Sequence, residues 1–247
     1  MSRTQELRSV SADLPELVRR YVDRNVPVDK QNRAAVRFTQ VGEMQLKPGH
    51  WLSFHAAQEM GVDHVELSWR ARFRAAPLVS LRVRDWYRAG SGGLDVRLWG
   101  VFPIANFSGD DFARGEAMRY LAELPWAPQA IAINRALAWR ELDESTVEVS
   151  TLVGRERVAV SLFFDGDGDI VAASAEARPR AVGKQVVDTP WGAVVGEYRE
   201  FDGVRLPTTA EVSWFLPEGK FSYFRGTVID WSVVSMERQD QQQDAER

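Results

Sequence analysis

The chain has 247 residues, of which 45% are hydrophobic and 27% charged, so it is long enough to bury one large core. It contains no cysteine, which excludes disulfides, thiolate catalysis and cysteine-ligated zinc. A formal charge of −4 argues against a general attraction to nucleic acid. No segment reads as a signal peptide or a membrane span, so we expect a cytoplasmic protein.

The two ends of the chain are polar and have the composition of flexible segments. We expect a flexible N-terminus (residues 1–12) and a disordered polar tail (residues 236–247), with a single β-rich domain over residues 13–235. Apolar residues at helical spacing predict an amphipathic helix from Asp13 to Arg24. Asp13 would cap this helix, and Glu16 would complete a capping box.

From Val36 onward the apolar period changes to two, which is typical of strands with one buried and one wet face. Turn-forming clusters separate these segments, at Gly90–Gly93, Asp165–Asp169 and Leu216–Gly219, and predict hairpins. The clearest predicted strands are Val65–Phe73, Val79–Tyr87, Leu94–Trp99, Val147–Val153, Val158–Phe164 and Phe221–Val233. We therefore expect a mostly β (α+β) fold.

One convincing helix, Gly109–Trp126, interrupts the strands, with Asp110 or Asp111 as its cap and Pro125 as its stop. A second short helix is predicted over Pro128–Ala138. When a helix interrupts the strands of an antiparallel sheet, the sheet usually wraps around that helix. The expected architecture is a curved antiparallel sheet or incomplete barrel around a central helix, preceded by the N-terminal amphipathic helix.

A polar stripe runs along the predicted central helix. Its members, Phe112, Glu116, Arg119, Tyr120 and Glu123, project to one side of the helix. Such a stripe is usual on a solvated helix face that carries ion pairs. If the sheet encloses the helix, the stripe lines a cavity instead, and this is the arrangement that we expect.

Asp85 is unusual because it occupies a place on the apolar face of the predicted strand Val79–Tyr87. A carboxylate that points inward must be paired or have a raised pKa. Arg119 and Arg178 are its natural partners. The alternative is that the apolar face ends at Val83 and leaves Asp85 in a hairpin.

Two other groups of residues have ordinary explanations. Asp165, Asp167, Asp169 and Glu176 match the ligand spacing of a calcium loop, but the flanking segments are strands and Ile170 replaces the required glycine, so a hairpin turn is favoured. The three histidines do not have a known ligand spacing. We read His50, His55 and His64 as structural or surface residues and expect neither a metal nor a cofactor.

A band of arginines is predicted on one sheet face, because alternate residues of neighbouring strands align. A polar outer face explains this band most simply, and nucleic-acid binding stays a minority option. The band consists of Arg70, Arg72, Arg74, Arg82, Arg84 and Arg97.

Several blocks of the chain resemble a bacterial family of uncharacterised proteins, from Leu14 to about Val234. The most specific block runs from Arg119 to Glu123 (RYLAE) with Trp126, and Pro190-Trp191 is a further part of the resemblance. The family implies no known activity. The strand, helix, strand order is also similar to the lipoprotein-carrier (Lol-type) fold, in which an incomplete barrel curls around helices and shelters acyl chains.

The leading hypothesis is that the protein binds a hydrophobic small molecule or lipid-like ligand in a cavity between the sheet and the central helix. Trp126, Trp191 and Trp214 would supply apolar walls, Arg119 and Tyr120 would orient a polar head group, and Arg178 is a further candidate. The first alternative is an enzyme with Asp85, Glu116 or Glu123 as general acid or base. The second is an interaction protein that binds an acidic partner through the arginine band.

Overall fold

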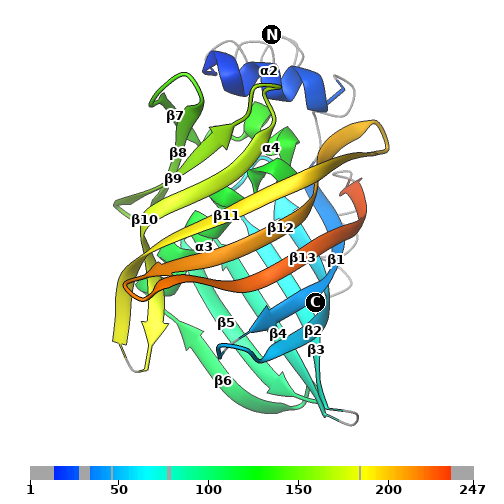
Figure 1. Cartoon of the computed structure of the whole chain (residues 1–247), viewed down its shortest axis with the longest axis vertical. Helices are drawn as coiled ribbons and strands as arrows, with labels where there is room; N and C mark the ends of the chain where they lie inside the picture. Colours follow the sequence, from blue (N-terminus) through cyan, green and yellow to red (C-terminus); the bar gives the residue numbers. More distant parts are fainter. Residues whose placement is uncertain (1–13, 28–33, 46, 77–78, 184, 235–247) are drawn as a thin grey trace.

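The computed structural model describes residues 14–27, 34–45, 47–76, 79–183 and 185–234. Within these residues, thirteen strands form one antiparallel sheet that curls around the central helix, while an N-terminal helix lies across the top (Figure 1). The predicted mostly β fold, a curved sheet around a helix, is confirmed. The predicted flexible N-terminus and polar tail lie outside the described residues.

The order of strands in the sheet is β6-β5-β4-β3-β2-β1-β13-β12-β11-β10-β9-β8-β7. Two meanders, β1 to β6 and β7 to β13, are therefore joined through the pairing of β1 with β13. The strands are β1 (Ala35–Gln45), β2 (Trp51–Gly61), β3 (Leu67–Ala76), β4 (Val79–Arg88), β5 (Ser91–Leu98), β6 (Phe102–Ser108), β7 (Ala138–Glu141), β8 (Thr146–Val153), β9 (Glu156–Phe164), β10 (Ile170–Val182), β11 (Gln185–Phe201), β12 (Val204–Leu216) and β13 (Gly219–Val234).

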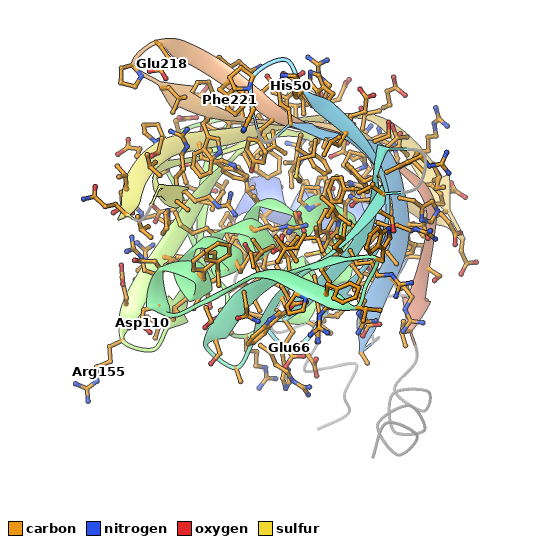
Figure 2. The ribbon with its side chains drawn as sticks, turned by 90° about the horizontal axis from the view of Figure 1, so that it is seen from below. His50, Glu66, Asp110, Arg155, Glu218 and Phe221 are labelled. Atoms are coloured by element: carbon orange, nitrogen blue, oxygen red, sulfur yellow. The ribbon has the colours of Figure 1, made fainter. Side chains whose placement is uncertain are left out.

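The helices are α2 (Glu16–Asn25), α3 (Asp110–Ala122) and α4 (Pro128–Ile133), with a short 3₁₀ helix, η2 (Leu124–Trp126), between the last two. None of the helices in the described part of the chain has the length and apolar character that crossing a membrane requires. Seen from below, α3 lies inside the surrounding strands, and side chains occupy the space between them (Figure 2).

The predicted capping of α2 is wrong. Pro15 stands at the N-cap position and makes no side-chain cap. A capping box needs the N–H of the N-cap residue, and proline has none. Glu16 forms an exposed ion pair with Arg19 instead, and Asp13 lies outside the described residues.

The ends of the other helices also differ from the prediction. Gly109, with a φ of 120°, stands at the N-cap of α3, so Asp110 and Asp111 lie in the first turn and do not cap it. The α-helix ends at Ala122, because the chain then tightens into η2, which contains Pro125. Helix α4 ends at Ile133 rather than at Ala138, which already belongs to β7.

Glycines in β5 let α3 pack closely on the sheet. The predicted turn Gly90–Gly93 is shorter than expected, since β5 begins at Ser91 and places Gly92 within the strand. A Cβ atom at Gly92 would lie 2.9 Å from the Cα atom of Ala113 in α3. Only a glycine permits this approach of helix to sheet.

The acidic segment between β9 and β10 is a hairpin turn, as predicted. Its backbone closes through the N–H of Gly168, which donates to the carbonyl of Asp165 at 3.0 Å. The side chain of Asp169 turns inward and accepts two hydrogen bonds from Arg205 of β12, at 2.6 and 2.7 Å. Among the described residues, no group of three or more acidic or histidine side chains has the arrangement of a metal site.

We expect Asp169→Ala to lower the free energy of unfolding by about 2–3 kcal/mol, because the side chain is only 9% exposed and its loss leaves Arg205 without its two charge-assisted hydrogen bonds. Asp167→Ala in the same turn is the control, since this residue is exposed and should change the free energy by less than about 0.5 kcal/mol. Urea unfolding measures both. Equal effects would show that the ion pair does not stabilise the sheet.

Candidate functional site

The concave face of β2 to β6 is largely apolar and becomes more exposed toward the free edge of the sheet. One row of paired residues shows this gradient, from Phe54 and Phe73, both 5% exposed, through the half-buried Leu81 and Leu98 to Phe102, which is 59% exposed. A neighbouring row contains the half-buried Val83 and Val96. The sheet thus presents apolar side chains on its inner face that no helix covers completely.

Arg119 of α3 ties the helix to this face of the sheet. Its Nη1 donates to Asp85 Oδ2 of β4 at 2.8 Å, and its Nε donates to Glu123 Oε1 at 2.8 Å. Gln58 of β2 closes the network by donating to Glu123. The guanidinium also lies 5.2 Å from the ring centroid of Trp69. Arg119 of the polar stripe is therefore enclosed and paired with Asp85, as we expected.

Arg178 of β10 reaches the other side of α3. Its Nε and Nη2 donate to the carbonyl of Gly115 at 3.2 and 3.1 Å. Its guanidinium lies 4.7 Å from the centroid of Trp191 and 5.6 Å from that of Trp214. The predicted residues Arg178, Trp191 and Trp214 thus meet in one place.

Tyr223 of β13 completes this wall and was not predicted. Its hydroxyl oxygen accepts hydrogen bonds from Trp191 Nε1 at 3.0 Å and from Arg178 Nη1 at 3.4 Å, while its ring stacks on Trp214. The hydroxyl proton has no acceptor among the described residues. The register shift next to Ser213 in the β12–β13 pairing gives this residue its orientation, and the sequence carries no signal for such a shift.

Glu116 lies between the two arginines. Its oxygens are 3.7 Å from Arg119 Nη1 and 3.8 Å from Arg178 Nη2, and its buried Oε2 has no hydrogen-bond partner in the described structure. Burial, together with the nearby charge of Asp85, raises the pKa of the Glu116 carboxyl to about 8. Burial likewise raises the pKa of Asp85, against the opposing effect of Arg119. With Glu116 protonated, two carboxylates, Asp85 and Glu123, balance two guanidinium groups.

Two of the predicted ligand-binding residues lie elsewhere in the core. The hydroxyl of Tyr120 donates to the carbonyl of Gly61 at 2.9 Å and accepts from Asn134 at 3.0 Å, so its hydrogen bonds hold the fold together. Trp126 donates to the carbonyl of Pro207 at 2.8 Å and packs on Phe38. Helical spacing placed Tyr120 and Arg119 on one side of the helix. In the structure, Arg119 faces Asp85 of β4 whereas Tyr120 faces Gly61 of β2.

A hollow of about 670 Å³ opens where β9 and β10 part above α3. Their pairing stops at Ser161 and Ser174, and Arg114 and Met118 of α3 line the hollow below this point. It lies between sheet and helix, but none of the predicted site residues lines it.

We expect Arg119→Ala to lower the free energy of unfolding by about 3 kcal/mol or more, because it leaves Asp85 and Glu123 buried without their cation. Arg119→Met combined with Asp85→Asn should recover much of this loss. Arg97→Ala, which removes an exposed pair with Asp95, is the control and should cost well under about 1 kcal/mol. Urea unfolding decides; a difference near zero for Arg119→Ala would contradict the enclosed arrangement.

We also expect stability to fall as the pH rises. The folded protein retains a proton on Glu116 up to a pKa of about 8, whereas the unfolded chain releases it near 4.5. Between these values the free energy of unfolding should therefore decrease by up to about 1.4 kcal/mol per pH unit. Glu116→Gln should flatten this slope, and Glu197→Gln, at an exposed position, should leave it unchanged. Unfolding curves at a series of pH values measure both; parallel slopes for all three proteins would refute the assignment.

The fold and the buried cluster can now be compared with known proteins. The chain is similar to a DUF1329 family protein from Desulfovibrio piger, with 12% identity and a TM-score of 0.46 over 92% of this chain and 91% of that one. It is similar to a LolA superfamily protein from Nitrosomonas europaea, with 10% identity and a TM-score of 0.47 over 90% of this chain and 94% of that one. No curated protein matches the sequence. The model of a family of unknown function, DUF6544, matches residues 4–226, and the chain belongs to this family.

Proposed function

We propose that the protein binds an apolar or amphipathic small molecule on the concave face of its half-barrel. The apolar part of the ligand would lie against β4, β5 and β6, and its polar end would point toward Tyr223 and Arg178. The observation that carries this proposal is the row of inner apolar residues that grows more exposed toward the edge of the sheet, from Phe73 to Phe102.

The inner apolar face supports a ligand because its side chains are left partly exposed to water. Leu81, Val83, Val96 and Leu98 point to the inside of the sheet, where a completed core would bury them, yet all four are only half-buried. Apolar side chains on a concave surface favour the uptake of an apolar guest, which removes them from water.

The polar end of the ligand has a matching group. Tyr223 already accepts from Arg178 and Trp191, so its hydroxyl proton remains available for an oxygen atom of a ligand. The neighbouring Trp214 offers a flat aromatic surface beside it. A carboxylate, carbonyl or hydroxyl attached to an apolar chain has the chemistry that this arrangement recognises.

A dye-binding experiment tests this proposal. The apolar dye N-phenylnaphthylamine should bind the purified protein, and decanoate and decanol should displace it. We expect Leu98→Asp to weaken dye binding by about tenfold, because it places a charge against the apolar part of the ligand. Leu152→Asp is the control, since Leu152 is 65% exposed on β8 and should leave dye binding unchanged.

Native mass spectrometry of protein purified from cells provides the second measurement. A bound apolar molecule in the wild type that is lost in Leu98→Asp would support the proposal. Protein that is empty and takes up no dye would overturn it, provided that thermal unfolding shows a folded wild type.

Glu116 favours a second candidate function, which is acid–base catalysis on the same ligand. A buried carboxyl group with a pKa of about 8 and an oxygen without a hydrogen bond has the properties of a general acid or base near neutral pH. Asp85 and Glu123 differ from it because both accept hydrogen bonds from Arg119. Recovery of a chemically altered ligand from the wild type, but an unaltered one from Glu116→Gln, would assign catalysis to this residue.

A further inference from the structure

The convex face of β2 to β5 carries arginines that the inner site does not use. Strand pairing places Arg70 opposite Arg84, and Arg82 opposite both Arg72 and Arg97. Like charges in directly opposite positions destabilise a sheet. These five residues line a shallow hollow of about 410 Å³, and we call them the arginine face.

Little negative charge balances this face. Asp95 pairs with Arg97 at 2.7 Å, and in the described ranges of the chain no carboxylate forms an ion pair with the other four arginines. The whole chain nevertheless has a net charge of −4. A cationic face on an acidic protein attracts an anionic partner and orients the protein toward it.

An exposed apolar hairpin borders the arginine face. In the turn between β5 and β6 and in β6 itself, Trp99 is 49% exposed, Val101 66% and Ile104 58%. Trp99 also has a φ of 51°, a conformation that is unfavourable for a bulky residue. A contiguous apolar segment of this kind usually marks an interaction site.

Arg82 connects the hairpin with the arginine face. A Cβ atom at Gly100, in the turn, would lie 2.6 Å from Cδ and 2.8 Å from Cζ of Arg82, so this side chain runs directly along the turn. The N–H of Trp99 donates to the carbonyl of Ser80 at 2.8 Å and fixes the turn beside β4. The cationic and apolar groups therefore belong to one continuous surface.

We propose that this surface docks onto a lipid bilayer that contains anionic phospholipid. The lipid phosphates lie against the arginine face, while Trp99 and Val101 enter the interface between head groups and acyl chains, where tryptophan is favoured. An acidic protein would match the arginines equally well. The exposed aromatic hairpin next to them favours the bilayer, because a bilayer surface has an anionic layer directly above an apolar one. The docking does not depend on the ligand proposed for the concave face.

Co-sedimentation with vesicles tests this proposal on the full-length protein. The wild type should bind vesicles of phosphatidylcholine mixed with phosphatidylglycerol, but not pure phosphatidylcholine, and added salt should weaken the binding. Arg72→Glu combined with Arg82→Glu should lower the partition coefficient by about tenfold or more. Trp99→Asn combined with Val101→Ser should lower it by about fivefold, and asparagine tolerates the positive φ of the turn.

Controls separate docking from general charge attraction. Arg155→Glu combined with Arg199→Glu changes the net charge by the same amount at exposed positions outside the arginine face, and it should leave vesicle binding intact. Equal losses in both charge-reversal variants would overturn the proposal, as would a wild type that does not sediment with anionic vesicles. Binding to soluble polyglutamate without binding to vesicles would also overturn it and assign the face to an acidic protein.

Discussion

The central structural constraint is the burial of Arg119 inside a largely apolar half-barrel. A guanidinium group cannot lose its proton, so the fold must supply carboxylates wherever this side chain is buried. Asp85 arrives from β4 and Glu123 from the next turn of the same helix, both at 2.8 Å. These contacts fix the rotation of α3 relative to the sheet, and burial of Glu116 beside Asp85 raises the pKa of its carboxyl to about 8.

The two faces of strand β4 differ in how their charged side chains are paired. On the concave side of β4, Asp85 is paired with a cation and shielded from water. On the convex side of the same strand, Arg82 and Arg84 face other arginines in solvent. Exposed like charges cost little because water and salt screen them, whereas an unpaired buried charge would cost several kcal/mol. A charged residue on the inner face of β4 therefore needs an oppositely charged partner, whereas one on the outer face does not.

Sequence patterns predicted the architecture well, because alternation of period two marks which residues of a strand face inward. The same alternation indicated Asp85 as an inward carboxylate or a hairpin residue, and it offered Arg119 or Arg178 as the partner that a buried charge needs; the structure places Asp85 inside and pairs it with Arg119. Other parts of the site depend on contacts between distant segments. Tyr223 faces Arg178 only because of a register shift in β13, and Tyr120 turns away from the cluster to reach Gly61. Helix capping was mispredicted for a different reason. The prediction relied on acidic side chains near each helix start, but the backbone places Pro15 and Gly109 at the N-cap positions.

The pairing of β1 with β13 makes the first and last strands of the sequence neighbours in the sheet. The N–H of Ala34 donates to the carbonyl of Val234 at 3.2 Å, so the first and last strands of the sheet are direct neighbours. The free edges of the sheet, β6 and β7, are instead joined covalently through α3 and α4. The sheet is therefore open between the two strands that the helices connect and closed between its first and last strands. The two meanders are thus held together twice, by the hydrogen bonds between β1 and β13 and by the covalent connection through α3 and α4.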